Sequence, residues 1–110
     1  MTNKSNEAET SGEASGQNEP VVVKRHNLKI LKQYYEQQVS GVKNFELRRM
    51  DRDFNIGDEI ELNEIDAAGR LGEYKPTGNS CLIKIKSITA GFEGLEDGYG
   101  ILGTELIYAP

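Results

Sequence analysis

The sequence predicts a small α+β domain that is mainly β, a barrel of five or six strands with one main helix near its N-terminus. Several short segments are rich in β-branched residues or alternate between apolar and polar residues, as strands do. One segment, Leu31 to Val39, carries apolar residues at helical spacing. Glycines separate these segments, and residues 21–110 are enough for one hydrophobic core only.

Residues 1–20 are expected to form a disordered acidic tail ahead of the domain at residues 21–110. They contain no Val, Ile, Leu, Phe or Tyr, so they cannot bury enough apolar surface to offset the entropy of ordering. One lysine and four glutamates give this tail −3 of the formal net charge of −5. The rest of the chain is close to −2, which confines any RNA binding to a local basic patch. The tail could solubilise the domain or compete for that patch.

The first strand and the main helix are expected between Val21 and Gly41. Val21 to Val23 and Leu28 to Ile30 form an extended segment with no helical period. The helix follows, and Gly41 stands where a left-handed C-terminal cap is wanted. Its apolar stripe consists of Leu31, Tyr34, Tyr35 and Val39.

Four more strands are expected along the rest of the chain. In residues 45–48 and 59–63, apolar and polar residues alternate, which predicts two half-buried strands. Residues 82–88 and 99–108 predict two more. The stretch from 67 to 79 contains three glycines and a proline, so we expect it to be the longest and most mobile loop.

A dense run of charges stands where a strand is expected to begin. Gly41, Lys43, Glu46 and Arg48 form a Gly-x-Lys-x-x-Glu-x-Arg pattern, and Glu46 and Arg48 share one face of an extended strand. On that face Lys43 and Arg48 could bind phosphate or a base edge, while Glu46 accepts from an exocyclic amine or orients the arginine. On residue chemistry alone, a salt-bridged strand face is the more common explanation.

The charged pattern resembles the signature of the ASCH domain superfamily, which are small PUA-like β-barrels thought to bind RNA. The resemblance covers most of residues 26–106 and is closest to a bacterial and phage branch of unknown function that opens with His-x-Leu-Lys-Ile, as His26 to Ile30 do here. Further matches are Asp51-Arg52-Asp53-Phe54, Gly57-Asp58, Gly94-Leu95, Gly98-Tyr99 and Leu102.

Two positions depart from that branch. Its middle loop usually carries Tyr-Thr-Gly-Arg, whereas Tyr74 to Asn79 lacks the arginine. Gly100 stands where a β-branched residue is expected, which suggests a bulge or a close backbone approach.

The resemblance implies a module that binds RNA or a nucleotide in a cleft beside Gly41 to Arg48. The alternative is an amidohydrolase, since some small ASCH proteins remove the acetyl group from N4-acetylcytidine with a lysine, a threonine three residues later and a distant glutamate. Lys43 matches this lysine, but Glu46 occupies the threonine position and would have to act as a general base on water. A protein-interaction module of a phage or mobile element is a third possibility.

The candidate ligand-binding residues are Lys43, Glu46, Arg48, His26 and Tyr74; Lys43 and Glu46 would be catalytic if the protein were an enzyme. His26 is the only histidine, the residue type whose unperturbed pKa lies near neutrality, so it could act as acid, base or stacking partner beside the cleft, although a lone histidine is more often a surface or capping residue. Tyr74 could stack on a base because its loop is expected to be mobile.

Other residues of the same types are expected to have structural roles. Four aromatic residues should be needed for the core, leaving Tyr99 as a second possible stacking residue. Asp51, Asp53 and Asp58 should cap turns. Four cations could form a basic stripe, but a solvated strand face explains them better. The aromatic residues are Tyr34, Tyr35, Phe45 and Phe54, and the cations are Arg49, Arg52, Lys84 and Lys86.

Composition excludes several other classes of protein. Because Cys81 is the only cysteine, an internal disulfide is excluded. With one cysteine and one histidine, the chain lacks a set of soft ligands at zinc-binding spacings, so no structural zinc site is expected. No apolar run approaches the roughly 20 residues of a membrane span, and no signal peptide is recognisable. We therefore expect a cytoplasmic monomer that needs no cofactor, with RNA or a nucleotide as its partner.

Overall fold

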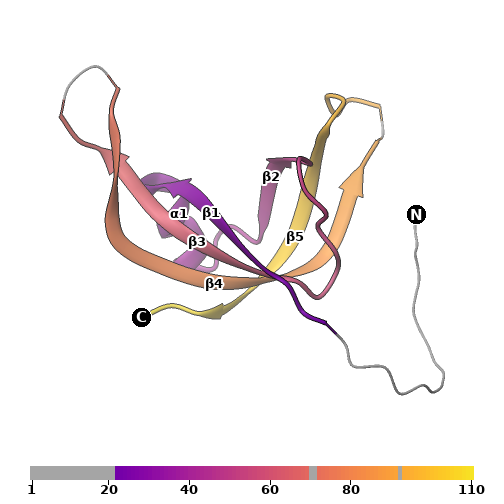
Figure 1. The fold of residues 1–110 in the computed structure, drawn as a ribbon, viewed down its shortest axis with the longest axis horizontal. Coiled ribbons are helices and arrows are strands. Elements are labelled where there is room, and N and C mark those ends of the chain that lie inside the picture. The colour runs from indigo at the N-terminus through magenta and orange to yellow at the C-terminus, as the bar shows by residue number, and fades with distance from the viewer. Residues whose placement is uncertain (1–21, 70–71, 92) are drawn as a thin grey trace.

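The computed structural model describes residues 22–69, 72–91 and 93–110, which form a mainly β domain with one short helix (Figure 1). The elements are β1 (Arg25–Leu31), α1 (Lys32–Ser40), β2 (Phe45–Arg49), β3 (Glu59–Ala67), β4 (Tyr74–Ala90) and β5 (Tyr99–Tyr108). The expected fold class, mainly β with five or six strands and one main helix near the N-terminus, is confirmed, with five strands. The acidic tail expected at residues 1–20 lies outside the described residues.

The five strands form a single curled sheet in the order β1-β3-β4-β5-β2. β1 pairs with β3 in parallel, and the other neighbours are antiparallel. β1 and β2 are therefore the two edge strands, and the curl turns the sheet into an open half-barrel (Figure 1). The edges of a sheet expose unpaired backbone groups, so the chain must satisfy those groups by other means.

The core fills the inner face of the curl because alternate strand residues point to that side. α1 packs against β1 and β3, and the Tyr35 hydroxyl donates to the Ser80 carbonyl at 3.1 Å. The buried apolar side chains are Leu28, Ile30, Tyr35, Phe54, Ile60, Leu62, Cys81, Ile83, Ile85 and Leu102.

The outer face of the sheet carries charges in cross-strand register. Arg25 of β1 pairs with Glu59 of β3, which in turn lies opposite Lys84 of β4. Lys84 lies opposite Glu105 of β5, and Glu105 forms an ion pair with Lys86 at 3.4 Å. Opposite charges on neighbouring strands are mutually favourable, so Lys84 and Lys86 belong to a solvated strand face, as expected.

The helix begins and ends close to the expected residues, but it buries a different set of side chains. Gly41 has φ of 84° and its N–H donates to the Gln38 carbonyl at 3.1 Å, so the expected left-handed cap is present. Tyr35 and Gln38 are the buried residues of α1, whereas Tyr34 is 40% exposed. The prediction that Tyr34 belongs to the core was wrong.

The faces of β2 are inverted relative to the apolar and polar pattern. Glu46 is only 3% exposed, whereas Phe45 and Leu47 are 45% and 54% exposed. The register explains this inversion, because Glu46 lies opposite the buried Leu102 of β5 and so points to the inner face. Phe45 therefore does not belong to the core, and the prediction that it does was wrong.

The long loop expected at residues 67–79 is shorter in the structure, because β4 already begins at Tyr74. The first three residues of β4, Tyr74 to Pro76, pair with β3. The register shifts between Asn63 and Ile65 of β3, where Glu64 faces the segment Thr77 to Asn79. Gly78 lies in this irregular part of β4 and has a φ of 94°, which a glycine adopts without strain.

The remaining differences are local. The first strand begins at Arg25, and Val22 and Val23 are exposed instead of continuing it; Val21 lies outside the described part. At Gly100, the close approach comes from a side chain, since a Cβ there would lie 2.6 Å from the Met50 sulfur. Register shifts between β4 and β5 occur elsewhere along the pair.

Candidate functional site

The end of α1 places Lys43 next to the helix. After the Gly41 cap, the Lys43 N–H donates to the Gln37 carbonyl at 3.0 Å, which holds the turn against the last helical residues. β2 starts two residues later and runs along β5 with Glu46 pointing inward. The short connection therefore brings a lysine, a glutamate and a helical glutamine to one place.

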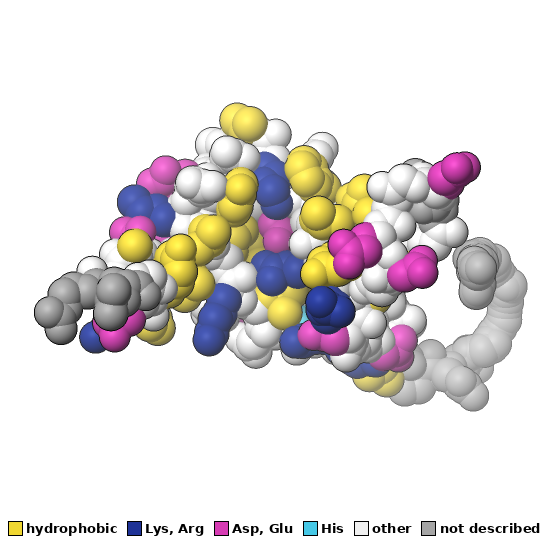
Figure 2. Space-filling model, turned by 90° about the horizontal axis from the view of Figure 1, so that it is seen from above, with side chains coloured by type: hydrophobic (Ala, Val, Ile, Leu, Met, Phe, Trp, Pro, Cys, Tyr) yellow, Lys and Arg dark blue, Asp and Glu magenta, His cyan; other side chains and the backbone are white. Residues whose placement is uncertain are grey.

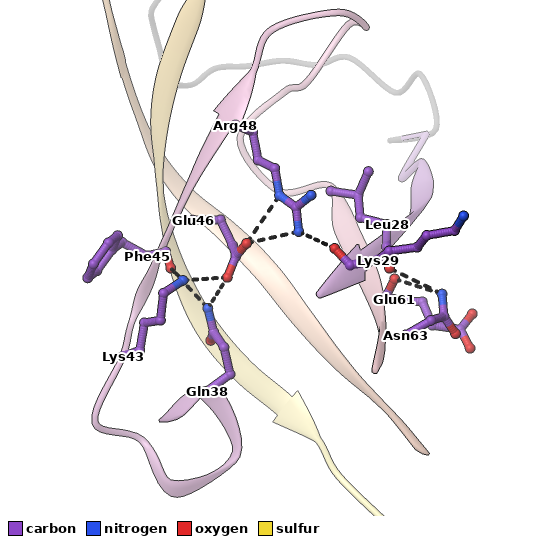
Figure 3. Close-up of polar contacts among 9 residues, drawn as sticks. All are labelled: Leu28, Lys29, Gln38, Lys43, Phe45, Glu46, Arg48, Glu61 and Asn63. Atoms are coloured by element: carbon purple, nitrogen blue, oxygen red, sulfur yellow. Dashed lines mark hydrogen bonds and ion pairs between the residues drawn. The ribbon is translucent and has the colours of Figure 1, made fainter. Parts of the chain in front are cut away.

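The carboxylate of Glu46 is the centre of a buried polar network (Figure 3). Its Oε2 accepts hydrogen bonds from Gln38 Nε2 at 2.7 Å and Lys43 Nζ at 2.6 Å. Its Oε1 accepts from Arg48 Nε at 3.1 Å and lies 3.0 Å from Arg48 Nη2. A charge this deeply buried is tolerated only when it is paired and hydrogen-bonded, which both oxygens of Glu46 are.

Arg48 connects the two edge strands of the sheet. From β2, its Nη2 donates to the backbone carbonyl of Lys29 on β1 at 2.8 Å. Figure 3 shows the guanidinium between Glu46 and this carbonyl, while the ammonium end of Lys29 points away from the network. Because β1 and β2 are not paired with each other, a side chain replaces the strand hydrogen bonds across the opening of the half-barrel.

The edge of β2 is covered in a similar way. The carbonyl of Phe45 accepts hydrogen bonds from Lys43 Nζ at 2.6 Å and from Gln38 Nε2 at 3.0 Å. A covered edge carbonyl is unavailable for pairing with another strand. The same side chains that surround Glu46 thus also cover one backbone carbonyl on each edge strand, that of Lys29 on β1 and that of Phe45 on β2.

A cavity of about 450 Å³ lies at the opening between β1, α1 and β2. This volume falls within the usual range for small-molecule sites. The cavity is lined by Lys29, Ile30, Leu31, Tyr34, Gln37, Lys43, Phe45, Glu46, Leu47 and Arg48.

Aromatic rings and cations meet at this cavity. Lys43 Nζ lies 4.7 Å from the centre of the Phe45 ring and 5.8 Å from that of Tyr34. A cation over an aromatic face is attracted by the ring quadrupole, which helps to keep both rings beside the ammonium. In Figure 2, one acidic side chain lies between basic ones in the middle of this face, with hydrophobic side chains around them.

The structure brings together three of the five predicted site residues. Lys43, Glu46 and Arg48 form the network, but His26 does not line the cavity. His26 is buried, its Nε2 lies 2.9 Å from Asp58 Oδ2, and its ring packs against Phe54. Asp58 also accepts from a turn N–H, that of Asn55, at 3.0 Å, as expected of a turn cap.

Tyr74 also lies outside the cavity lining, at the first residue of β4 instead of in a loop. The second possible stacking residue, Tyr99, is engaged by Arg49, whose Nη2 donates to the tyrosine hydroxyl at 3.2 Å. Arg52 lies beside Phe54 on the turn after β2. These aromatic and basic residues are scattered and do not extend the cavity.

A second buried carboxylate, Glu64 of β3, lies at the irregular pairing with β4. Its Oε1 accepts from Thr77 Oγ1 at 2.6 Å and from Asn79 Nδ2 at 3.0 Å. Burial by itself raises the pKa of Glu64, but these two hydrogen bonds and the charge of Lys32 outweigh it and hold the pKa below its ordinary value. Glu64 therefore stays ionised at neutral pH and anchors the hairpin.

Cys81 offers no nucleophile. It lies in the core at 2% exposure, where burial, assisted by the negative charge of Glu46, raises the pKa of its thiol to about 11. The thiolate is the reactive form, and it is scarcely populated at neutral pH. Thr77, the other nucleophile considered, already donates its hydroxyl to Glu64.

Three residues of the candidate site were missed by the sequence reasoning. Gln38 supports Glu46, and Tyr34 and Phe45 supply the exposed rings of the cavity. A polar residue three positions after the buried Tyr35, on the inner side of the helix, was a usable signal for Gln38. No local signal could identify the rings, since their exposure depends on which face of β2 is buried.

Neither a metal site nor a membrane-spanning helix is found within residues 22–69, 72–91 and 93–110. No group of three or more His, Cys, Asp or Glu side chains there could hold a metal ion. The one helix of the described part, α1, is too short and too polar to cross a membrane.

One family model matches most of the described domain. The family model described as Domain of unknown function (DUF3850) matches residues 25–104, which span all five strands, the last one up to Thr104. A search of curated proteins found no match. The matched region includes the complete network around Glu46.

Proposed function

Because the chain belongs to the DUF3850 family, whose description assigns no activity, we propose its function from the cavity itself: it binds single-stranded RNA or a nucleotide between β1, α1 and β2. The observation that carries the proposal is the combination of two half-exposed aromatic rings, Tyr34 and Phe45, with the Lys43 ammonium beside them, while Arg48 lines the same cavity. Single-stranded nucleic acids are bound by this combination of stacking surface and positive charge.

The two rings are suited to stacking on an unpaired base. Tyr34 and Phe45 keep 40% and 45% of their surface exposed, although apolar rings gain free energy from burial. The Lys43 ammonium lies beside both of them. A base that enters the cavity would cover aromatic surface that the protein leaves uncovered, and this supplies a favourable term for binding.

The cations are positioned before any ligand arrives. Arg48 is held by Glu46 and by the Lys29 carbonyl, and Lys43 by Glu46 and the Phe45 carbonyl. Within the described residues, Arg48 Nη1 has no hydrogen-bond acceptor, so it can donate to a phosphate oxygen. Preorganised donors lose less conformational entropy on binding than mobile ones.

The geometry supports binding better than amide hydrolysis. A general base on water needs a carboxylate oxygen that can accept a proton, and both oxygens of Glu46 already accept two contacts each from cations or an amide. In this network Glu46 orients Lys43 and Arg48 instead of facing a ligand.

The test is the affinity for a short labelled single-stranded RNA, measured by fluorescence anisotropy, with Tyr34→Ala as the variant. Base stacking on an aromatic side chain contributes about 1–3 kcal/mol, so we expect affinity to fall roughly 5- to 150-fold. Lys43 and Arg48 are poorer first targets, because each also neutralises the buried Glu46.

The matched control is Tyr108→Ala, which removes a tyrosine that is 62% exposed at the end of β5 and does not line the cavity. It should bind RNA as tightly as the wild type. Equal affinity of wild type and Tyr34→Ala would contradict the stacking role, and the absence of RNA binding at low salt would refute the proposed function.

A further inference from the structure

We infer that the cavity takes one internal nucleotide of a single strand, that is, one phosphodiester and its unpaired base, in preference to a nucleoside triphosphate or a terminal phosphomonoester. This inference rests on the proposed function and narrows its ligand. It follows from the charge that the network around Glu46 leaves uncompensated, and from the size of the cavity.

Lys43, Arg48 and Glu46 together give the site a net charge of one positive unit. Lys43 and Arg48 bring two positive charges, and the carboxylate of Glu46, in contact with both, cancels one of them. A phosphodiester carries a single negative charge and matches this excess. A phosphomonoester carries about −1.5 to −2 at neutral pH, and a triphosphate carries more, so each would leave negative charge uncompensated in a partly desolvated site.

The neighbouring cations add less to this charge than Lys43 and Arg48 do. Lys29 lines the cavity, but its ammonium end points away from Arg48 and Glu46 (Figure 3). Arg25 is paired with Glu59 at 2.8 Å on the outer face. Because the whole chain is net negative, charge outside the cavity gives a polyanion no additional long-range attraction.

The shape of the site agrees with one nucleotide. A volume of about 450 Å³ lies toward the lower end of the range for small-molecule sites, and the two aromatic rings lie at the same cavity as the cations. The cavity opens between two strands that are not paired with each other, so the chain on either side of the bound nucleotide can continue outward.

The first measurement is the salt dependence of RNA binding by the full chain. Neutralising one phosphate of a single strand gives a slope of about −0.7 for log K against log salt concentration, and we expect this value. Lys86→Ala, which removes one exposed lysine from the outer face, is the control and should leave the slope unchanged. A slope twice as steep or more would overturn the single-phosphate assignment.

The second measurement is competition against the labelled RNA. We expect a dinucleoside monophosphate with hydroxyl ends to compete better than uridine monophosphate or uridine triphosphate. Stronger competition by either of these would overturn the inference and leave the proposed function standing. If labelled RNA does not bind at low salt, the proposed function itself fails, and the inference fails with it.

Discussion

Replacing Glu46 by glutamine should affect stability and RNA binding in opposite directions. The substitution keeps the shape of the side chain but removes the charge that compensates Lys43 and Arg48. One of the two terminal oxygens becomes an NH₂ group, which would face the N–H groups of Gln38 and Lys43 or those of Arg48. Two cations then remain side by side in a site where Lys43 is only 10% exposed.

The loss of stability can be estimated from these contacts. Breaking a buried ion pair by removing one partner costs about 3–5 kcal/mol, and we expect the lower end, about 3 kcal/mol, because Arg48 remains partly accessible to water. In a domain of this size, each kcal/mol lowers the melting temperature by about 4–8 °C, so the expected loss is about 12–24 °C. This is a large share of a total stability of about 5–15 kcal/mol.

The assay is urea denaturation followed by circular dichroism, with thermal melting as a second readout. Glu36→Gln is the matched control, since it makes the same substitution in an exposed i,i+4 pair with Lys32. Its unfolding midpoint should coincide with that of the wild type, because exposed pairs of this type contribute little. The folded Glu46→Gln protein should also bind RNA with a steeper salt slope, about −1.4, because two cations are then uncompensated.

An unfolding midpoint of Glu46→Gln equal to that of Glu36→Gln would refute the reasoning. It would mean that water reaches the carboxylate of Glu46 and that the network does not hold the edges of the sheet together. A destabilised variant with an unchanged salt slope would keep the structural role but contradict the charge balance assigned to the cavity.

Three further predictions concern other parts of the domain. The pKa of Glu64 is lowered in the folded state, so the stability that its ionised form contributes is complete above the unfolded pKa near 4.5 and is lost as pH falls through the lower folded pKa. Thr77→Val removes a hydrogen bond to this carboxylate, so it should raise the pH midpoint of acid unfolding and lower the free energy of unfolding by about 1–2 kcal/mol. The exposed Thr89→Val is the control and should change neither quantity. Cys81 should react with a thiol reagent at neutral pH only after unfolding, and rapid modification of the native protein would contradict its burial. Gly41→Ala forces a side chain into φ of 84° and should destabilise the domain by about 1 kcal/mol in thermal melting; an unchanged melting temperature would show that the cap is not needed.

The local elements were predictable because their signals are local. The spacing of apolar residues and the position of Gly41 identified α1, since a helix is stabilised by contacts three and four residues apart. The short separation of Lys43, Glu46 and Arg48 was enough to place them together once a helix end and a strand start were assigned. The resemblance to ASCH domains remains a hypothesis, which a solved structure with bound RNA would test.

The predictions failed where the answer depends on a partner element. Alternation in β2 shows that its two faces differ, but the register with β5 decides that Glu46 is buried and that Phe45 is exposed. His26 was predicted to lie beside the cleft, but it is buried against Asp58, a residue of a turn 32 positions later in the chain. Tyr74 was assigned to a loop because glycines and a proline surround it, yet pairing with β3 keeps it in a strand.

The sequence by itself determined the class of the fold, the single helix and the motif that supplies the charges, because these depend on residues close together in the chain. Only the tertiary structure decided that the sheet stays open, that Arg48 reaches the Lys29 carbonyl across the opening, and that Gln38 supports Glu46. The physical reason is that curl and register are set by packing between distant segments. The same packing creates the cavity that Tyr34, Phe45, Lys43 and Arg48 line together.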